Sequence, residues 1–382
     1  MHPEPQAVLA AAASREAELL ARVRELVKTE LAPLTVDVDL KGVYPEAFLR
    51  KLGALGGYLG AVGPEYGGLA TGIATTVKVM EEVSRECLSS GFLVWCQTAC
   101  ARYIQMSENA AARAAYLPRL ASGELLAGTG LSNTVKSCDD IEAFRLKAQR
   151  VAGGYRVNGT LPWVSNLGDD HVFATGCPVE GETGLVFFVV ECGAADFRLQ
   201  PGGQFVALEG TRTLACQFRD TFIPDERVLT HPRESEAYIR RIKPGMILAQ
   251  MGMGLGLVQA CADMMRYSDR THAHVNRFLD DQADDIQGAL DGARAKSYEL
   301  AAALARDPLA DVVREVLAVR LAGGELSLRA ANAAMLHMGA RGYLHRSPAQ
   351  RRLREAYFVA IVTPAIKHLR KELARMPEQL AA

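Results

Sequence analysis

The order of three stretches with different hydrophobic periodicity constrains the fold of this chain more than any single motif. Residues 1–125 place apolar side chains at helical spacing, as in EAELLARVRELVKTEL and IATTVKVMEEVSREC. Residues 126–232 instead contain short runs rich in β-branched and aromatic residues, such as GLVFFVVEC and TLACQFRDTFIP. Residues 233–382 return to long helical patterns. This order predicts an α+β protein rather than an alternating βαβ fold.

The same three stretches give the expected domains. We expect an N-terminal helical domain over residues 1–125 and a middle β domain over residues 126–232. A hairpin is expected around Gly153 and Gly154 within the middle domain. Residues 233–382 predict a C-terminal domain similar to a four-helix bundle, because their long apolar stripes need partner helices.

Charge and cysteine usage limit the classes of protein to consider. The chain has 43 Lys and Arg against 44 Asp and Glu, a net charge of −1, and no basic stripe, which argues against a nucleic-acid partner. Its eight cysteines show no CxxC spacing, which predicts reduced, mostly buried thiols rather than a disulfide framework or a zinc site. Such cysteines, and an N-terminus without a basic segment typical of signal peptides, favour a cytoplasmic protein.

One uncharged stretch of 18 residues, 245–262, approaches the length of a membrane span. It contains Gln250 and Gln259 and leads directly into the charged sequence DMMRYSDR. We therefore expect a helix buried in the bundle and no membrane partner. The GMGLG within it follows no strand, so its small residues predict close helix packing rather than a dinucleotide-binding turn.

Several familiar catalytic motifs are absent from the sequence. No Walker loop, HExxH or GxSxG occurs. His272 and His274 alternate in a charged segment, and His337 and His345 flank a glycine-rich turn. We interpret these four as surface or turn histidines rather than metal ligands, and we expect no metal site.

Five motifs distributed along the chain have a shared order and spacing. They are GPEYGG (63–68), YLPRLASGE (116–124), GGYRVNGTLPWVSN (153–166), FRDTFIPDERVL (218–229) and HMGARGYLHR (337–346). Together they resemble the acyl-CoA dehydrogenase flavoprotein family over nearly the whole chain. The resemblance implies the fold of that family, helical at both ends with a β domain between, and an FAD-dependent oxidoreductase.

The resemblance also implies contacts with the flavin ring. Trp163 would pack beside the isoalloxazine, and the Ser165 hydroxyl would bond near its reactive nitrogen. Main-chain groups and the hydroxyl around Leu131, Ser132 and Asn133 would stabilise negative charge on the pyrimidine edge during reduction. The alternative is that Trp163 is a core aromatic and Ser165 a turn residue.

The family's catalytic carboxylate has no counterpart at either of its two usual positions. By motif spacing, these positions hold Thr363 and Met246, and no acid lies between Glu355 and Glu372. The catalytic residues are therefore unknown from the sequence. Thr363 instead fits a helix N-cap, with Pro364 as the first residue of a helix that contains IKHLRKELARM.

The residues that would contact the adenosine side of the cofactor match the family's pattern less well than those near the flavin ring. The family's Arg falls on Thr271, with Arg270 one residue away as a substitute, and the glycine-rich turn retains Gly339 but has Leu336 where Gln is expected. Weaker FAD binding, FMN, or reduced flavin as a co-substrate therefore remain open.

Three functional hypotheses follow. The first is a flavin-dependent oxidoreductase that acts on an acyl thioester of CoA or a carrier protein, with a non-standard or missing base and an unknown electron acceptor. The second is a flavin-dependent monooxygenase on the same fold, which needs no α-proton base. The third is a catalytically silent subunit that pairs with an active homologue. The long apolar helices and the family's shared cofactor sites predict a homodimer or homotetramer.

Overall fold

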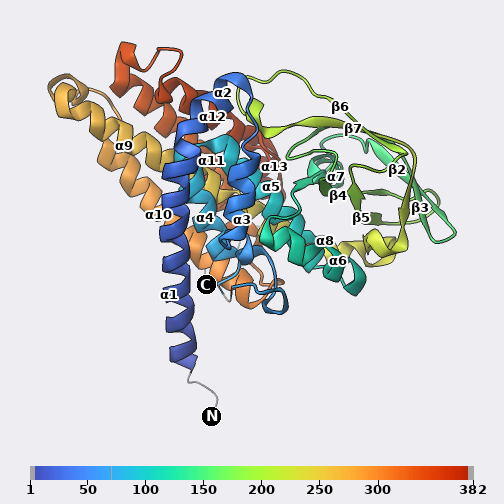
Figure 1. Ribbon diagram of the computed structural model, residues 1–382. Coiled ribbons are helices and arrows are strands. Elements are labelled where there is room, and N and C mark those ends of the chain that lie inside the picture. The colour runs from blue at the N-terminus through green and yellow to red at the C-terminus, as the bar shows by residue number, and fades with distance from the viewer. Residues whose placement is uncertain (1–4, 70, 377–382) are drawn as a thin grey trace.

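The computed structural model describes residues 5–69 and 71–376, which form a helical part, a sheet part and a second helical part in chain order. Figure 1 shows the strands gathered on one side of the molecule and the long helices on the other. The predicted α+β architecture, helical at both ends with a middle β domain, is confirmed.

The N-terminal part contains helices α1 to α6. They span α1 (Pro5–Leu26), α2 (Thr35–Lys41), α3 (Glu46–Ala54), α4 (Ile73–Glu86), α5 (Leu88–Gln105) and α6 (Ala110–Ser122). Asn109 caps the start of α6, where its side chain accepts a hydrogen bond from the Ala112 N–H, and Gly123, with φ of 75°, caps the end. Helix α5 is buried on almost every side, so it forms the centre of this part.

The middle part contains the strands and one short helix. These are β1 (Ala127–Thr129), α7 (Leu131–Cys138), β2 (Leu146–Val151), β3 (Gly154–Val164), β4 (Val172–Pro178), β5 (Leu185–Glu191), β6 (Phe197–Pro201), β7 (Leu214–Pro224) and β8 (Val228–Thr230). Over the described residues the strands form two four-stranded sheets, ordered β1-β4-β5-β8 and β2-β3-β7-β6. Val151 pairs with Gly154, which confirms the predicted hairpin, and Gly153 supplies the positive φ of its turn.

The inner faces of the two sheets share one hydrophobic core. Phe173 of β4 lies against Phe218 of β7, with ring centroids 6.3 Å apart, and Val157 and Phe188 are completely buried nearby. This rigid core fixes the end of β3, where the sequence places the flavin motif.

The C-terminal part consists of longer helices. They span α8 (Ser235–Ala249), α9 (Met251–Asn276), α10 (Ala283–Arg306), α11 (Val313–Met338), α12 (Pro348–Ile361) and α13 (Ile366–Arg375). Within the described residues, the helical stretch Pro232–Asn276 is long and apolar enough to cross a membrane by composition alone, but 89% of its most apolar window is buried inside the protein. The prediction of a buried bundle helix is therefore confirmed.

Glycines allow α9 to approach α4 closely. A Cβ atom added to Gly256 would lie 2.3 Å from the Glu81 carbonyl oxygen, and one added to Gly252 would lie 2.6 Å from the Val77 carbonyl oxygen. Both distances are shorter than any tolerable contact, which confirms that GMGLG is a packing motif.

The cysteines also match their prediction. All eight lie in the described residues and are free; seven are buried and Cys138 is exposed.

Candidate active site

A cavity of about 1130 Å³ lies where the three parts of the chain meet. It is larger than the ~300–1,000 Å³ typical of ligand pockets. Its walls come from α5, α7, the end of β3, the loop over residues 203–213, α8, α11, α12 and the start of α13. Most of the lining side chains are apolar, with hydroxyl groups at a few places.

Trp163 and Ser165 reach the cavity from the end of β3. The Trp163 side chain is 60% exposed and meets Phe205 edge to face, with ring centroids 6.4 Å apart. It is therefore not a core aromatic. The Ser165 hydroxyl lies 2.6 Å from the Thr213 hydroxyl, which also lines the cavity. The two residues thus present an aromatic face and a hydroxyl pair to one ligand space.

The N-terminus of α7 also faces the cavity. Leu131 is its first residue, and both Leu131 and Ser132 line the cavity. The free N–H groups and the positive end of a helix dipole favour negative charge at such a position. The Asn133 side chain does not line the cavity; it bonds to Glu142, the Ala143 carbonyl and the Arg145 N–H.

Thr363 and Met246 both line the cavity. The Thr363 hydroxyl lies 2.8 Å from that of Ser132, and its carbonyl accepts a hydrogen bond from Gln250. The N-cap predicted at Thr363 is wrong: α13 begins at Ile366, after a cap residue, Ala365, that makes no side-chain capping bond. Tertiary hydrogen bonds hold Thr363 in the cavity wall and outweigh its local capping preference.

Two buried guanidinium groups lie behind these positions. Arg320 donates to Gln250, the same amide that holds Thr363, and burial lowers the pKa of Arg320 to about 10. Arg102 lies against Gly245, next to Met246, and burial likewise lowers its pKa to about 10. Neither forms an ion pair with a carboxylate in residues 5–69 and 71–376.

The carboxylates nearest to the cavity are already engaged. Glu142 alone among the described lining residues carries a carboxylate, and it accepts hydrogen bonds from Asn133 and Lys136. Burial would raise the pKa of Glu142, but these bonds outweigh burial and lower it, so Glu142 is a weak base. Glu355 is 1% exposed, does not line the cavity and pairs with Arg352 instead.

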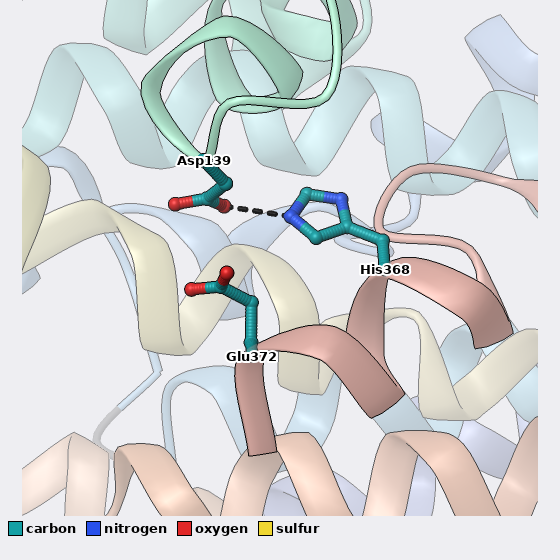
Figure 2. A group of neighbouring side chains, drawn as sticks. All are labelled: Asp139, His368 and Glu372. Atoms are coloured by element: carbon teal, nitrogen blue, oxygen red, sulfur yellow. Dashed lines mark hydrogen bonds and ion pairs between the residues drawn. The ribbon is translucent and has the colours of Figure 1, made fainter. Parts of the chain in front are cut away.

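One residue that the sequence analysis missed is His368, in the first turn of α13. It lines the cavity, is 2% exposed, and its Nε2 lies 2.8 Å from Asp139, the residue that follows α7 (Figure 2). Glu372 lies one helical turn further along the same face (Figure 2). The i, i+4 spacing of His368 and Glu372 in the sequence could have shown that they share a helix face. Nothing near them in the sequence indicated that Asp139 would be their partner.

Arg270 and Gly339 do not line this cavity. Arg270 is exposed on α9 and stacks over Tyr267, while Gly339 ends α11 with φ of 56°. The ends of these two helices are joined by a hydrogen bond from Ser268 to the His337 carbonyl. The structure thus does not bring Arg270 and Gly339 together with the other predicted cofactor residues, and their cofactor roles stay predictions.

His337 corrects one of our interpretations. It is 3% exposed rather than a surface or turn residue, and its ring bonds to Asp269 and to the Asp281 carbonyl. His337 therefore connects α11 to α9, through Asp269, and to the turn before α10, through Asp281.

Comparison with known proteins gives a consistent result. The family model described as "Acyl-CoA dehydrogenase, N-terminal domain" matches residues 14–124. Mitochondrial isovaleryl-CoA dehydrogenase of Solanum tuberosum is 26% identical over 91% of this chain and 87% of its own length. Glutaryl-CoA dehydrogenase of Desulfococcus multivorans is 28% identical over 90% of this chain and 91% of its own length.

Solved structures share the fold. A glutaryl-CoA dehydrogenase in complex with glutaryl-CoA superposes with a TM-score of 0.85 at 23% identity, covering 94% of both chains. Two further structures contain flavins. An acyl-CoA dehydrogenase from Bacillus anthracis complexed with FAD superposes with a TM-score of 0.79 at 18% identity, covering 94% of this chain and 66% of its own. KijD3 with FMN superposes with a TM-score of 0.76 at 18% identity, covering 98% of this chain and 95% of its own.

The fold and the relatives agree on one class of protein, the acyl-CoA dehydrogenases. The predicted resemblance to the acyl-CoA dehydrogenase family is supported by the match of residues 14–124, by these relatives and by the shared fold.

Proposed function

We propose that this protein binds FAD in the cavity between its three parts and oxidises an acyl thioester of CoA or of a carrier protein. The observation that carries the proposal is one continuous cavity lined by Trp163, Ser165, the N-terminus of α7 and Thr363. A bound flavin supplies the hydride acceptor for such an oxidation.

The residues present fit a flavin ring. The exposed face of Trp163 offers apolar contact, and the paired hydroxyls of Ser165 and Thr213 offer a donor at the ring edge. The first turn of α7 offers N–H groups and a positive dipole end where negative charge would accumulate. The volume of about 1130 Å³ leaves space for an acyl chain beside the ring.

The experiment that tests this function is an absorbance spectrum of the purified protein before and after addition of a panel of acyl-CoAs without oxygen. We expect a flavin spectrum that loses its visible absorbance with at least one member of the panel. Protein that binds neither FAD nor FMN at micromolar concentrations would refute the proposal.

Replacing Trp163 with Ala should weaken flavin binding roughly tenfold. Aromatic stacking contributes ~0.5–1.5 kcal/mol beyond buried area, and 1.4 kcal/mol corresponds to a factor of ten in affinity. Titration followed by flavin fluorescence measures this change. Trp163→Phe is the matched control, because it retains an aromatic face and should bind within a few-fold of the wild type. Equal affinities for all three proteins would place the flavin elsewhere.

The protein should assemble into a homodimer or homotetramer. Large apolar side chains are exposed around the end of the bundle near Arg270 and Gly339; they are Tyr267, Phe278, Leu336, Tyr343 and Leu344. Such a concentration of apolar surface is typical of subunit contacts. Light scattering should return two or four times the chain mass of 41.3 kDa. A mass of one chain over a wide concentration range would contradict this prediction.

A monooxygenase is the second candidate, favoured by the occupation of both usual base positions by Thr363 and Met246. Such an enzyme would consume oxygen rapidly once its flavin is reduced, whereas a dehydrogenase would not. Oxygen uptake by the reduced protein therefore separates the two functions.

A further inference from the structure

Arg102, in the last turn of α5, carries a positive charge that no carboxylate in the described part of the chain balances. Although the residue as a whole is half-buried, its Nε and Nη2 atoms are closed off from solvent and have no hydrogen-bond partner among the described residues. Burial lowers the pKa of Arg102 to about 10, so the group is still protonated at neutral pH. Buried donors of this kind normally bind water or an ion. The guanidinium therefore requires an acceptor that these residues do not supply.

A small cavity of about 10 Å³ lies beside Arg102, between α4, α5 and α8. This volume holds about one water-sized atom. The guanidinium lies against Gly245, which also lines the cavity: a Cβ atom added to Gly245 would be 2.5 Å from Nε and 3.0 Å from Nη2 of Arg102. Glycine at this position thus leaves the space that the guanidinium occupies.

The first turn of α4 faces the same cavity. Ile73 and Thr76 line it, Gly72 before them provides no side-chain cap, and no acidic residue lies in this turn. Unpaired N–H groups and the positive dipole end make the start of a helix favourable for an anion. The Thr76 hydroxyl forms no hydrogen bond with another described residue and adds a donor. Glu16 bonds to the neighbouring Thr75 but does not line the cavity.

The small cavity adjoins the main cavity. Met246 lines both, so its side chain forms part of the partition between them. Along α5, Phe92 and Trp95 line the main cavity, and Ala99 and Arg102 line the small one. Residues three and four apart share a helix face, so these four form one stripe that leads from the main cavity to the guanidinium.

We infer that Arg102 and the first turn of α4 form a binding site for one small anion beside the main cavity. The occupant is a halide ion or one oxygen of a carboxylate. The carboxylate comes from solution or from the end of an acyl group that lies in the main cavity and displaces the flexible Met246 side chain. Only this last source rests on the proposed function.

Charge favours an anion over a water molecule at this site. A water would accept hydrogen bonds from Arg102 but leave its charge uncompensated, and a buried charge without a partner is costly. The C-terminal end of α5 supplies only about half an elementary charge. One monovalent anion completes the balance and also meets the donors of α4.

Bromide binding tests the site directly. Urea unfolding is measured at increasing potassium bromide, with potassium sulfate keeping the ionic strength constant. We expect bromide to lower the unfolding equilibrium constant saturably, by about 100-fold at 100 times its Kd. Crystals grown in bromide should show an anomalous bromine signal at the cavity. A bromine signal in crystals without a bromide effect in solution is an adventitious ion only and overturns the site.

Arg102→Met retains a long side chain but removes the charge. It should lose the bromide effect, and without bromide it should be at least as stable as the wild type, because no uncompensated charge is buried. Arg241→Met is the matched control. Arg241 pairs with Glu108 at 3.0 Å and does not line the cavity, so this variant should keep the full bromide effect.

Thr76→Val removes the hydroxyl but retains the branched shape. It should weaken bromide affinity roughly two- to tenfold, the usual contribution of one hydrogen bond. This variant and the bromine signal of the wild type decide the question if Arg102→Met does not fold. Wild-type affinity in Thr76→Val together with no bromine signal would then overturn the site.

Two acyl-CoAs distinguish the sources of the anion. Hexanoyl-CoA and adipoyl-CoA have equal chain lengths and differ by a terminal carboxylate. Calorimetric titration of the flavin-loaded protein compares their affinities. Adipoyl-CoA that binds about tenfold more tightly or better, the usual gain from a hydrogen bond to a charged group, identifies the end of the acyl group as the source, provided that Arg102→Met removes the preference and bromide competes.

A bromide effect without a preference for adipoyl-CoA identifies a free ion as the occupant. Absence of both effects overturns the site, as does an equal bromide effect in the wild type and Arg102→Met. A protein that binds no flavin refutes the proposed function, and the bromide measurements still decide whether the anion site exists.

Discussion

Replacing Glu355 with Ala should lower the free energy of unfolding by about 3–5 kcal/mol, the usual cost of leaving one member of a buried ion pair without its partner. Glu355 is 1% exposed and lies 2.8 Å from Arg352, which is 3% exposed. Arg352 also donates to the Ser84 and Glu86 carbonyls at the end of α4. Removing Glu355 would leave a guanidinium buried among helix ends with carbonyl oxygens alone. Urea unfolding followed by circular dichroism measures the loss.

The matched control is Glu299→Ala in α10. Glu299 pairs with Lys296 at 2.9 Å, also within one helical turn, but the two side chains are 66% and 44% exposed. Exposed pairs contribute only ~0–1 kcal/mol. Similar losses for Glu355→Ala and Glu299→Ala would show that the buried pair does not support the packing of α12 on α4.

Gly256→Ala should lower the free energy of unfolding by ~1–3 kcal/mol, although Ala is the better helix former. A Cβ atom at Gly256 would lie 2.3 Å from the Glu81 carbonyl oxygen and 2.7 Å from the Arg85 nitrogen, so α9 and α4 would have to separate. These contacts are with backbone atoms, which cannot rotate away.

Gly288→Ala provides the opposite case. Gly288 lies in α10, and an added Cβ atom would meet nothing within 4 Å. Here the gain in helix propensity acts alone and should raise the free energy of unfolding by up to ~1 kcal/mol. The two changes are chemically identical and differ only in surroundings. A gain in stability from both would mean that α4 and α9 pack less closely than the structure shows.

The cavity wall around Trp163 and the start of α7 could be predicted because it depends on local sequence. Trp163 and Ser165 belong to one strand end, and Leu131 and Ser132 belong to one helix start, so their motifs remain together in the chain. The helical and strand segments could also be predicted from the sequence, because hydrophobic periodicity is a local property.

The cavity wall formed by α7 and the start of α13 could not be predicted, because it depends on contacts between distant segments. Asp139 and His368 are separated by 229 residues, and Ser132 and Thr363 by 231. Local preference made Thr363 a helix cap, whereas its hydrogen bonds with Ser132 and Gln250 place it in the cavity wall. His337 likewise resembled a turn residue in the sequence, but contacts with Asp269 and Asp281, more than 50 residues away, bury it.

The buried guanidinium groups of Arg102 and Arg320 place two positive charges near the cavity, although the chain as a whole is nearly neutral. With pKa values of about 10, both remain protonated at neutral pH, although the chain carries a net charge of only −1. Charges in a water-poor interior are weakly screened, so their potential extends into the cavity behind Met246 and Thr363. This positive potential would therefore favour a negatively charged state of the ligand in the cavity, although the net charge of the protein is close to zero.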